Sequence, residues 1–147
     1  DPKIFPNRDD YELKMIEVLQ SKSIDLICLA GFMQILGKKF IQAFPEKIIN
    51  IHPSLLPAFP GLNVQKKALE HGAKFSGCTV HFVNEELDEG PIILQSPVPI
   101  LDEDDAASLS ERILEQEHII YPEAIRLIIE KKIMFSGRRV LSKTKGS

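Results

Sequence analysis

Residues 24–30 constrain the fold more than any other part of the chain, because they are almost continuously apolar. A run of this length is too short for an ordinary helix, and a strand that is apolar at successive positions is normally buried on both faces. Such strands are typical of parallel sheets that have helices packed on each side. We therefore expect residues 24–30 to form a buried strand in an α/β domain.

The rest of the chain alternates between helical and strand patterns. A helix is expected from Asn7 or Asp9, and a long helix after the acidic run at residues 102–105, with Pro122 starting a new helical stretch. The other expected helices lie at residues 38–44 and 64–69, and the other expected strands at residues 47–51, 75–83, 91–98 and 132–135. This alternation predicts an α/β fold: an open, mostly parallel twisted sheet with helices on both faces.

The amino-acid composition limits the classes of function that the chain can have. A chain of 147 residues with 44% hydrophobic and 27% charged residues is ordinary for one soluble globular domain. A net charge of −3 argues against a nucleic-acid partner, and no apolar run is long enough for a membrane span. Two cysteines give no disulfide framework, which favours a reducing, cytoplasmic setting. The composition does not decide whether the protein forms a homodimer.

Residues 50–57, Asn-Ile-His-Pro-Ser-Leu-Leu-Pro, carry the clearest chemical signal. Asn50 and His52 are two positions apart at the end of a short apolar run, so on a strand their side chains share one face. A carboxamide can donate to an oxyanion and an imidazole can carry charge, which together suit acyl transfer. An isolated Asn-x-His pair is more often two polar residues that happen to end a strand. Other segments of the sequence must therefore show whether this pair belongs to a catalytic site.

Polar loops follow three of the expected strands, at residues 31–36, 52–61 and 84–90. In open α/β sheets, ligands bind beyond the carboxyl ends of the parallel strands. We therefore expect one crevice to gather these loops.

Five blocks of sequence resemble the glycinamide ribonucleotide formyltransferases, which are folate-dependent enzymes. They lie, in the order found in that family, at residues 29–33, 50–57, 77–83, 87–91 and 116–122. The resemblance implies a Rossmann-like formyltransferase fold. It also implies transfer of the formyl group of 10-formyltetrahydrofolate, as co-substrate, to the amino group of glycinamide ribonucleotide in purine synthesis, without a metal.

By this resemblance, the catalytic residues are Asn50, His52 and Asp88. Asn50 would donate a hydrogen bond to the formyl oxygen as the amine attacks, and a charged His52 would stabilise the same oxygen. Asp88 would favour the charged form of His52 and move protons from the amine. The alternative for Asp88 is a turn aspartate before Glu89 and Gly90.

The resemblance also implies two sets of binding residues. Those expected to bind folate are Arg8, Met33, Gln34, Ile35, Leu36, Asn50, Asn84, Glu85, Glu86, Leu87 and Asp88. Gln34 replaces a basic residue of the family; a contact made through the backbone would tolerate this change, whereas a role of the side chain would be lost. Arg8 could equally be a plain surface arginine. Those expected to bind the ribonucleotide are Pro53, Leu114, Glu115, Gln116 and Glu117.

The position of Glu117 in the sequence points to a binding role independently of the family resemblance. It follows Ile113 by four positions and so shares the buried stripe of the long helix, where a carboxylate needs a partner. The resemblance implies that the ribose hydroxyls of the ribonucleotide are this partner; the alternative is that Glu117 lies at the edge of the helix and pairs with a lysine. His81 and His118 are expected to be structural histidines with satisfied hydrogen bonds, and His71 to be exposed.

One departure from the family is large. Its members begin with a strand and a glycine-rich turn that holds the substrate phosphate with backbone N–H groups, whereas all eight glycines of this chain lie at position 31 or later. We expect residues 1–147 to be a single catalytic domain that lacks this N-terminal phosphate-binding segment and first strand, with a basic tail at 138–147. The alternatives are a formyltetrahydrofolate hydrolase, a folate-binding fragment without turnover, and a generic nucleotide-binding domain.

Overall fold

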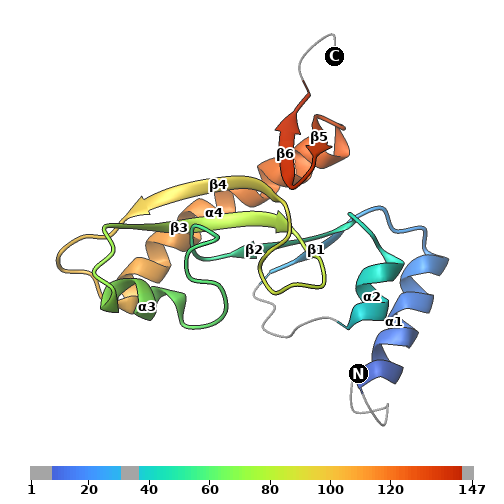
Figure 1. The fold of residues 1–147 in the computed structure, drawn as a ribbon, viewed down its shortest axis with the longest axis horizontal. Helices are drawn as coiled ribbons and strands as arrows, with labels where there is room; N and C mark the ends of the chain where they lie inside the picture. Colours follow the sequence, from blue (N-terminus) through green and yellow to red (C-terminus); the bar gives the residue numbers. More distant parts are fainter. Residues whose placement is uncertain (1–7, 31–36, 144–147) are drawn as a thin grey trace.

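The structure, a computed structural model, describes residues 8–30 and 37–143. Figure 1 shows a four-stranded sheet with two short helices at one end and a small hairpin beyond it. The elements are α1 (Arg8–Ser21), β1 (Ile27–Leu29), α2 (Lys38–Ala43), β2 (Ile48–His52), α3 (Val64–Glu70), β3 (Phe75–Phe82), β4 (Ile92–Pro99), α4 (Ala106–Ile129), β5 (Ile133–Ser136) and β6 (Arg139–Ser142).

The main sheet has the strand order β1-β2-β3-β4 and is mixed. As predicted, β1 and β2 are parallel neighbours, with Leu29 beside Asn50. However, β2 pairs with β3 and β3 with β4 in antiparallel fashion. The α/β class is confirmed, but the expectation of a mostly parallel sheet is wrong for the described strands. Burial explains the error, because β3 is almost wholly buried between two neighbours although it runs antiparallel to both.

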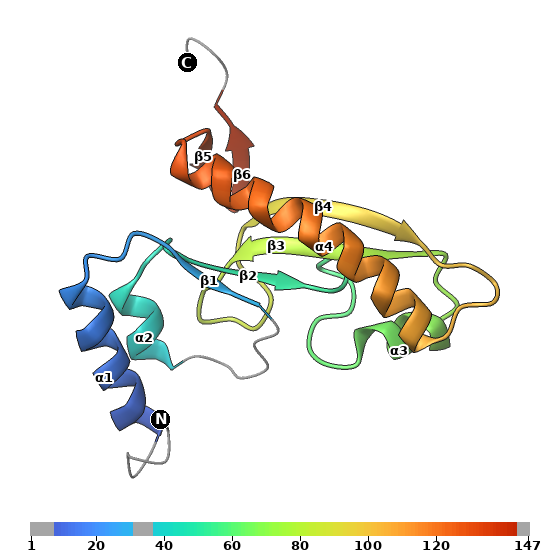
Figure 2. The same ribbon diagram turned by 180° about the vertical axis from the view of Figure 1, so that it is seen from behind.

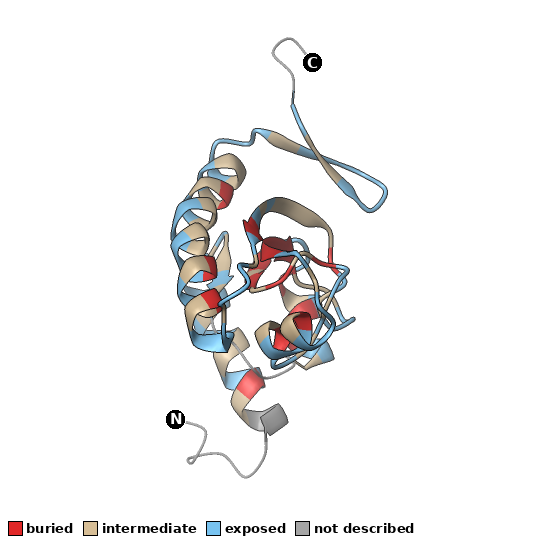
Figure 3. Cartoon of the chain, turned by 90° about the vertical axis from the view of Figure 1, so that its left-hand side faces the viewer, coloured by how far each residue is buried: buried red, intermediate tan, exposed pale blue. Residues whose placement is uncertain are grey.

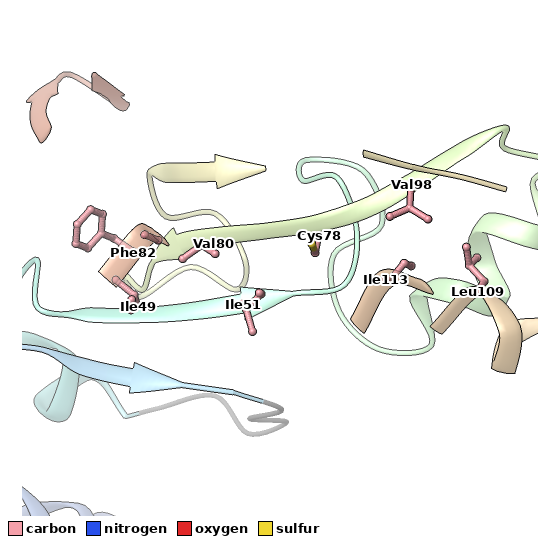
Figure 4. Close-up of a cluster of buried hydrophobic side chains, with 9 residues drawn as sticks. Ile49, Ile51, Cys78, Val80, Phe82, Val98, Leu109 and Ile113 are labelled. Atoms are coloured by element: carbon pink, nitrogen blue, oxygen red, sulfur yellow. The ribbon is translucent and has the colours of Figure 1, made fainter. Parts of the chain in front are cut away.

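Helices cover both faces of the sheet, as predicted. Adjacent residues of β2 point to opposite faces. Ile48 packs with Phe40 and other side chains of α2, whereas Ile49 belongs to a cluster with Leu109 and Ile113 of α4. Figure 2 shows α4 lying along its face of the sheet, and Figure 4 shows the cluster between the strands and α4. The opposite face of β2 therefore carries its alternate side chains, including those of Asn50 and His52.

Helix α4 is continuous, so the prediction that Pro122 starts a new helical stretch is wrong. A proline inside a helix removes the hydrogen bond to the carbonyl four residues earlier, which here is that of His118. Both residues are exposed, so water can solvate this carbonyl. Burial of the opposite side of the helix, including Ala124, keeps its two halves in line.

The two ends of the described chain differ from expectation. In β1, Cys28 is exposed, and among the described strands β1 lies at the edge of the sheet rather than buried on both faces. The basic stretch expected to be a tail from Arg138 begins as strand β6, which pairs with β5 around Gly137 at φ +60°. Figure 3 shows this hairpin to be largely exposed. Within the described residues, none of the helices combines the length and apolar character that a membrane span needs.

Candidate active site

Polar side chains share the face of the sheet opposite α4. Asn50 and His52 alternate with buried isoleucines on β2, so they leave the strand on the same side, as predicted. Directly across on β3, Asn50 pairs with His81 and His52 pairs with Thr79. Regular antiparallel pairing thus places two histidines, an amide and a hydroxyl in one patch.

Asp88 reaches this patch from the loop after β3. Its Oδ2 lies 3.6 Å from Nδ1 of His52, and its Oδ1 lies 3.8 Å from Nε2 of His81. The backbone N–H of Gly61 donates to the same Oδ2 at 2.8 Å. Asp88 has φ +53°, a left-handed conformation that is unfavourable for a residue with a side chain. These contacts hold the carboxylate against the histidines, so the predicted proximity of His52 and Asp88 is found.

His52 is bracketed by two acceptors. Its Nε2 lies 2.9 Å from the carbonyl oxygen of Phe59, and because a carbonyl only accepts, Nε2 carries a proton. Its Nδ1 faces the carboxylate of Asp88, at a distance longer than the 2.7–2.9 Å typical of a charge-assisted hydrogen bond. This longer distance leaves Nδ1 available to a substrate.

Asn50 and His81 each present a buried polar atom that the fold does not satisfy. Among the described residues, Oδ1 of Asn50 and Nε2 of His81 have no hydrogen-bond partner. Leaving such atoms unpaired is costly, and in native proteins they are usually satisfied by water or a ligand. This face of the sheet is therefore suited to receiving polar groups of a small molecule.

The prediction that His81 is only a satisfied structural histidine is wrong. Its Nδ1 lies 3.0 Å from the carbonyl of Phe82, but its other ring nitrogen faces Asp88. Burial lowers the pKa of His81, and the carboxylate of Asp88 only partly opposes this, so the neutral ring is favoured. The signal that could have found it is the period of two, since Val80 and Phe82 face the core and His81 must face the other way.

Glu117 occupies the half-buried position on α4 that the helical stripe predicts. Burial raises the pKa of its carboxyl group. Burial and the Glu117 charge also raise the pKa of the Cys78 thiol, to about 12, which places Glu117 near β3. Among the described residues its carboxylate makes no hydrogen bond, and no contact joins it to His52 or Asp88.

The other residues predicted to bind the ribonucleotide differ in their exposure. Gln116 accepts a hydrogen bond from Ser96 at 2.8 Å, and Pro53 is half-buried beside His52. Leu114 and Glu115 lie on the solvent side of α4. The structure thus brings the predicted catalytic residues together but does not bring all of these residues to them.

The predicted folate residues are only partly described. Met33, Gln34, Ile35 and Leu36 lie outside the described residues, and Arg8 is placed only as the first residue of α1. Asn84, Glu85 and Glu86 line a cavity of about 530 Å³, together with apolar side chains that include Val83 and Phe135. Leu87 is exposed. Within the described part of the chain, no group of three or more potential ligand side chains could hold a metal ion.

Comparison with known proteins agrees with this architecture. The family model described as "Formyl transferase" matches residues 1–125, so the chain belongs to the formyl transferase family. A phosphoribosylglycinamide formyltransferase from Haemophilus influenzae is 48% identical over 131 residues, which cover 89% of this chain and 62% of that relative.

Two further matches extend the comparison. The trifunctional purine biosynthetic protein adenosine-3 of Drosophila melanogaster is 48% identical over 134 residues, covering 91% of this chain but only 10% of the relative. A crystal structure of glycinamide ribonucleotide transformylase 1 from Symbiobacterium toebii superimposes with a TM-score of 0.93 at 53% identity, covering 98% of this chain and 68% of that one. The chain therefore spans about a tenth of the length of the Drosophila relative and less than two thirds of the length of the Haemophilus relative.

Proposed function

We propose that the complete protein transfers the formyl group of 10-formyltetrahydrofolate to the amino group of glycinamide ribonucleotide, a step of purine synthesis. The observation that carries this proposal is the position of Asp88, whose carboxylate lies 3.6 Å from the imidazole of His52 on the face that also bears Asn50. Relatives named for this reaction are similar over most of the chain.

In this reaction the amine nitrogen attacks the formyl carbon, so a C–N bond forms and one electron pair of the C=O bond moves to the oxygen. The side-chain N–H of Asn50 and the charged imidazole of His52 stabilise that oxygen. Collapse of the intermediate restores the C=O bond and breaks the bond to N10 of the folate. N10 leaves with its electron pair and gains a proton.

Proton movement falls to Asp88. The attacking amine must lose one proton overall, and N10 must gain one, so a group between them has to carry it. A carboxylate that accepts a hydrogen bond from Gly61 and faces His52 is placed for this role. No covalent bond to the protein is needed, because the donor already carries a reactive acyl group.

Two regions supply binding in this proposal. The folate is held by the loop of Asn84, Glu85, Glu86 and Leu87 and by the residues that the resemblance implies, Arg8 and those at 33–36. The half-buried carboxylate of Glu117 accepts hydrogen bonds from the ribose hydroxyls, which supplies the partner that the fold itself does not.

A formyltetrahydrofolate hydrolase would use the same catalytic residues with water as the nucleophile. The two activities are separated by incubating the complete protein with 10-formyltetrahydrofolate, with and without glycinamide ribonucleotide. The proposal expects formylated ribonucleotide and little formate. Formate release that does not depend on the ribonucleotide would contradict it and support the hydrolase.

A further inference from the structure

A network of buried hydrogen bonds shapes the proline-rich loop that follows His52. The hydroxyl of Ser54, which is fully buried, lies 2.6 Å from the carbonyl oxygen of Ala58 and 3.0 Å from that of Phe59. Two carbonyl oxygens therefore converge on one hydroxyl proton. Without that proton the two oxygens would repel each other, and the loop would relax.

The sheet clamps the start of the same loop. Thr79, fully buried and directly opposite His52, donates to the carbonyl of Ser54 at 2.7 Å. Its hydroxyl oxygen accepts from the backbone N–H of Leu56 at 3.1 Å and from the amide of Gln95 at 3.0 Å. These contacts use the one donor and both acceptor positions of a threonine hydroxyl, so the backbone around Ser54 is fixed relative to β3.

The loop ends by presenting a carbonyl to the imidazole. Phe59 has φ +49°, which is strained for a residue with a side chain, and its carbonyl accepts from Nε2 of His52 at 2.9 Å. With the proton fixed on Nε2, a neutral His52 has only a lone pair at Nδ1. An N–H at Nδ1, the nitrogen that faces Asp88, then exists only in the imidazolium form.

We infer that Ser54 is a positioning residue that acts through the Phe59 carbonyl to fix the tautomer of His52, so that His52 donates from Nδ1 only as a cation. Among the described residues, the charged or titratable groups that face His52 are Asp88, at 3.6 Å, and His81 beyond it. The role of this arrangement in catalysis rests on the proposed function, whereas the fixed tautomer of His52 does not depend on that function.

The test compares two serine-to-alanine changes in the complete protein. Ser54→Ala removes the hydroxyl between the two carbonyls. Ser76→Ala is the matched control, because Ser76 is also buried but its hydroxyl has no hydrogen-bond partner among the described residues. Ring ¹⁵N–¹H spectra of ¹⁵N-histidine-labelled protein, recorded across the titration of His52, report which nitrogen carries the proton. Formyl transfer gives kcat and KM.

We expect the wild type and Ser76→Ala to show neutral His52 protonated on Nε2. Ser54→Ala should show a mixture of Nε2–H and Nδ1–H tautomers, and a kcat lower by about tenfold or more with KM little changed, because the misplaced group acts mainly in the transition state. An unchanged tautomer in folded Ser54→Ala would overturn the inference. If that variant does not fold, Thr79→Val, which keeps the volume and removes the clamp, takes its place with the same expected result.

Failure of the proposed function would look different. A wild type that transfers no formyl group to the ribonucleotide contradicts that function. The tautomer comparison between Ser54→Ala and Ser76→Ala still decides whether Ser54 positions His52.

Discussion

Asn50 and His81 lie directly opposite each other on β2 and β3, and each carries a buried polar atom without a partner among the described residues. In a stable fold, buried polar atoms are normally paired. Water or a ligand can supply the missing partners, so this pair of residues, with Asp88 next to His81, is suited to receive polar groups of a substrate.

Replacement of Asp88 by asparagine should retain the fold and lower turnover about a hundredfold or more, since proton transfer by a positioned group contributes at least this factor. The asparagine oxygen can still accept from the Gly61 N–H, so the loop should stay in place. The measurement is kcat for formyl transfer, with Glu89→Gln as a control on the exposed neighbour. A wild-type rate in Asp88→Asn would remove this residue from the mechanism.

The sequence predicted part of this arrangement on physical grounds. The period of two in a strand places Asn50 and His52 on one face, and the structure agrees. The approach of Asp88 could not be derived in this way, because it depends on the path of a loop after β3. The resemblance to a family supplied it. For His81, the same period of two places the ring on the face away from Val80 and Phe82, but it could not show that Asp88 approaches this face.

The directions of the strands also could not be predicted from the local sequence pattern. A buried apolar run reports that both faces of a strand are covered, and this holds for β3 although its neighbours are antiparallel. The continuity of α4 through Pro122 likewise depends on which side of the helix is buried. Both features are set by tertiary packing that a short window of sequence does not contain.

Glu117→Gln should weaken ribonucleotide binding while leaving folate binding unchanged. Loss of a charged acceptor to the ribose hydroxyls should raise KM for the ribonucleotide by about tenfold. Glu115→Gln, on the exposed side of the same helix, is the control. Equal KM values in the two variants would show that the ribose lies elsewhere.

The same substitution should stabilise the unliganded fold at neutral pH. Because burial raises the pKa of Glu117, the folded state holds its proton more tightly than the unfolded state does. The charged group therefore disfavours folding as pH rises through and above this raised pKa. Thermal unfolding should show a higher Tm for Glu117→Gln than for the wild type at pH 7, and a smaller difference at pH 4. A lower Tm at pH 7 would indicate a stabilising partner for this carboxylate.

Asp104→Asn should make the protein less stable at pH 7. The Arg112 guanidinium, which donates to both oxygens of this carboxylate at 2.9 and 2.6 Å, holds its pKa well below the ordinary range. A lowered folded-state pKa gives stability that is present at neutral pH and lost as pH falls below the ordinary aspartate value. We expect a lower Tm than that of the wild type at pH 7, with the gap narrowing at pH 3. Asp102→Asn, on an exposed residue of the same acidic run, should change little at either pH.

The last prediction separates the two binding functions of the protein. The described chain contains the Asn84–Glu86 part of the predicted folate site and the His52–Asp88 pair, and its match covers 62% of the length of the Haemophilus relative. All eight glycines of residues 1–147 lie at position 31 or later, and a phosphate without the backbone donors of a glycine-rich turn loses several charge-assisted hydrogen bonds. We therefore expect residues 1–147 alone to bind folate but to transfer little formyl group, and the complete protein to be active.

The measurement is formyl transfer to glycinamide ribonucleotide by both proteins at matched concentration, together with folate binding by calorimetry. In the described sheet, β1 has an unpaired edge, and such an edge favours association between chains, so the oligomeric state of both proteins is measured by light scattering. A monomeric 147-residue chain with full activity would show that the phosphate site lies within these residues. Loss of folate binding as well as transfer would contradict the separation of the two sites.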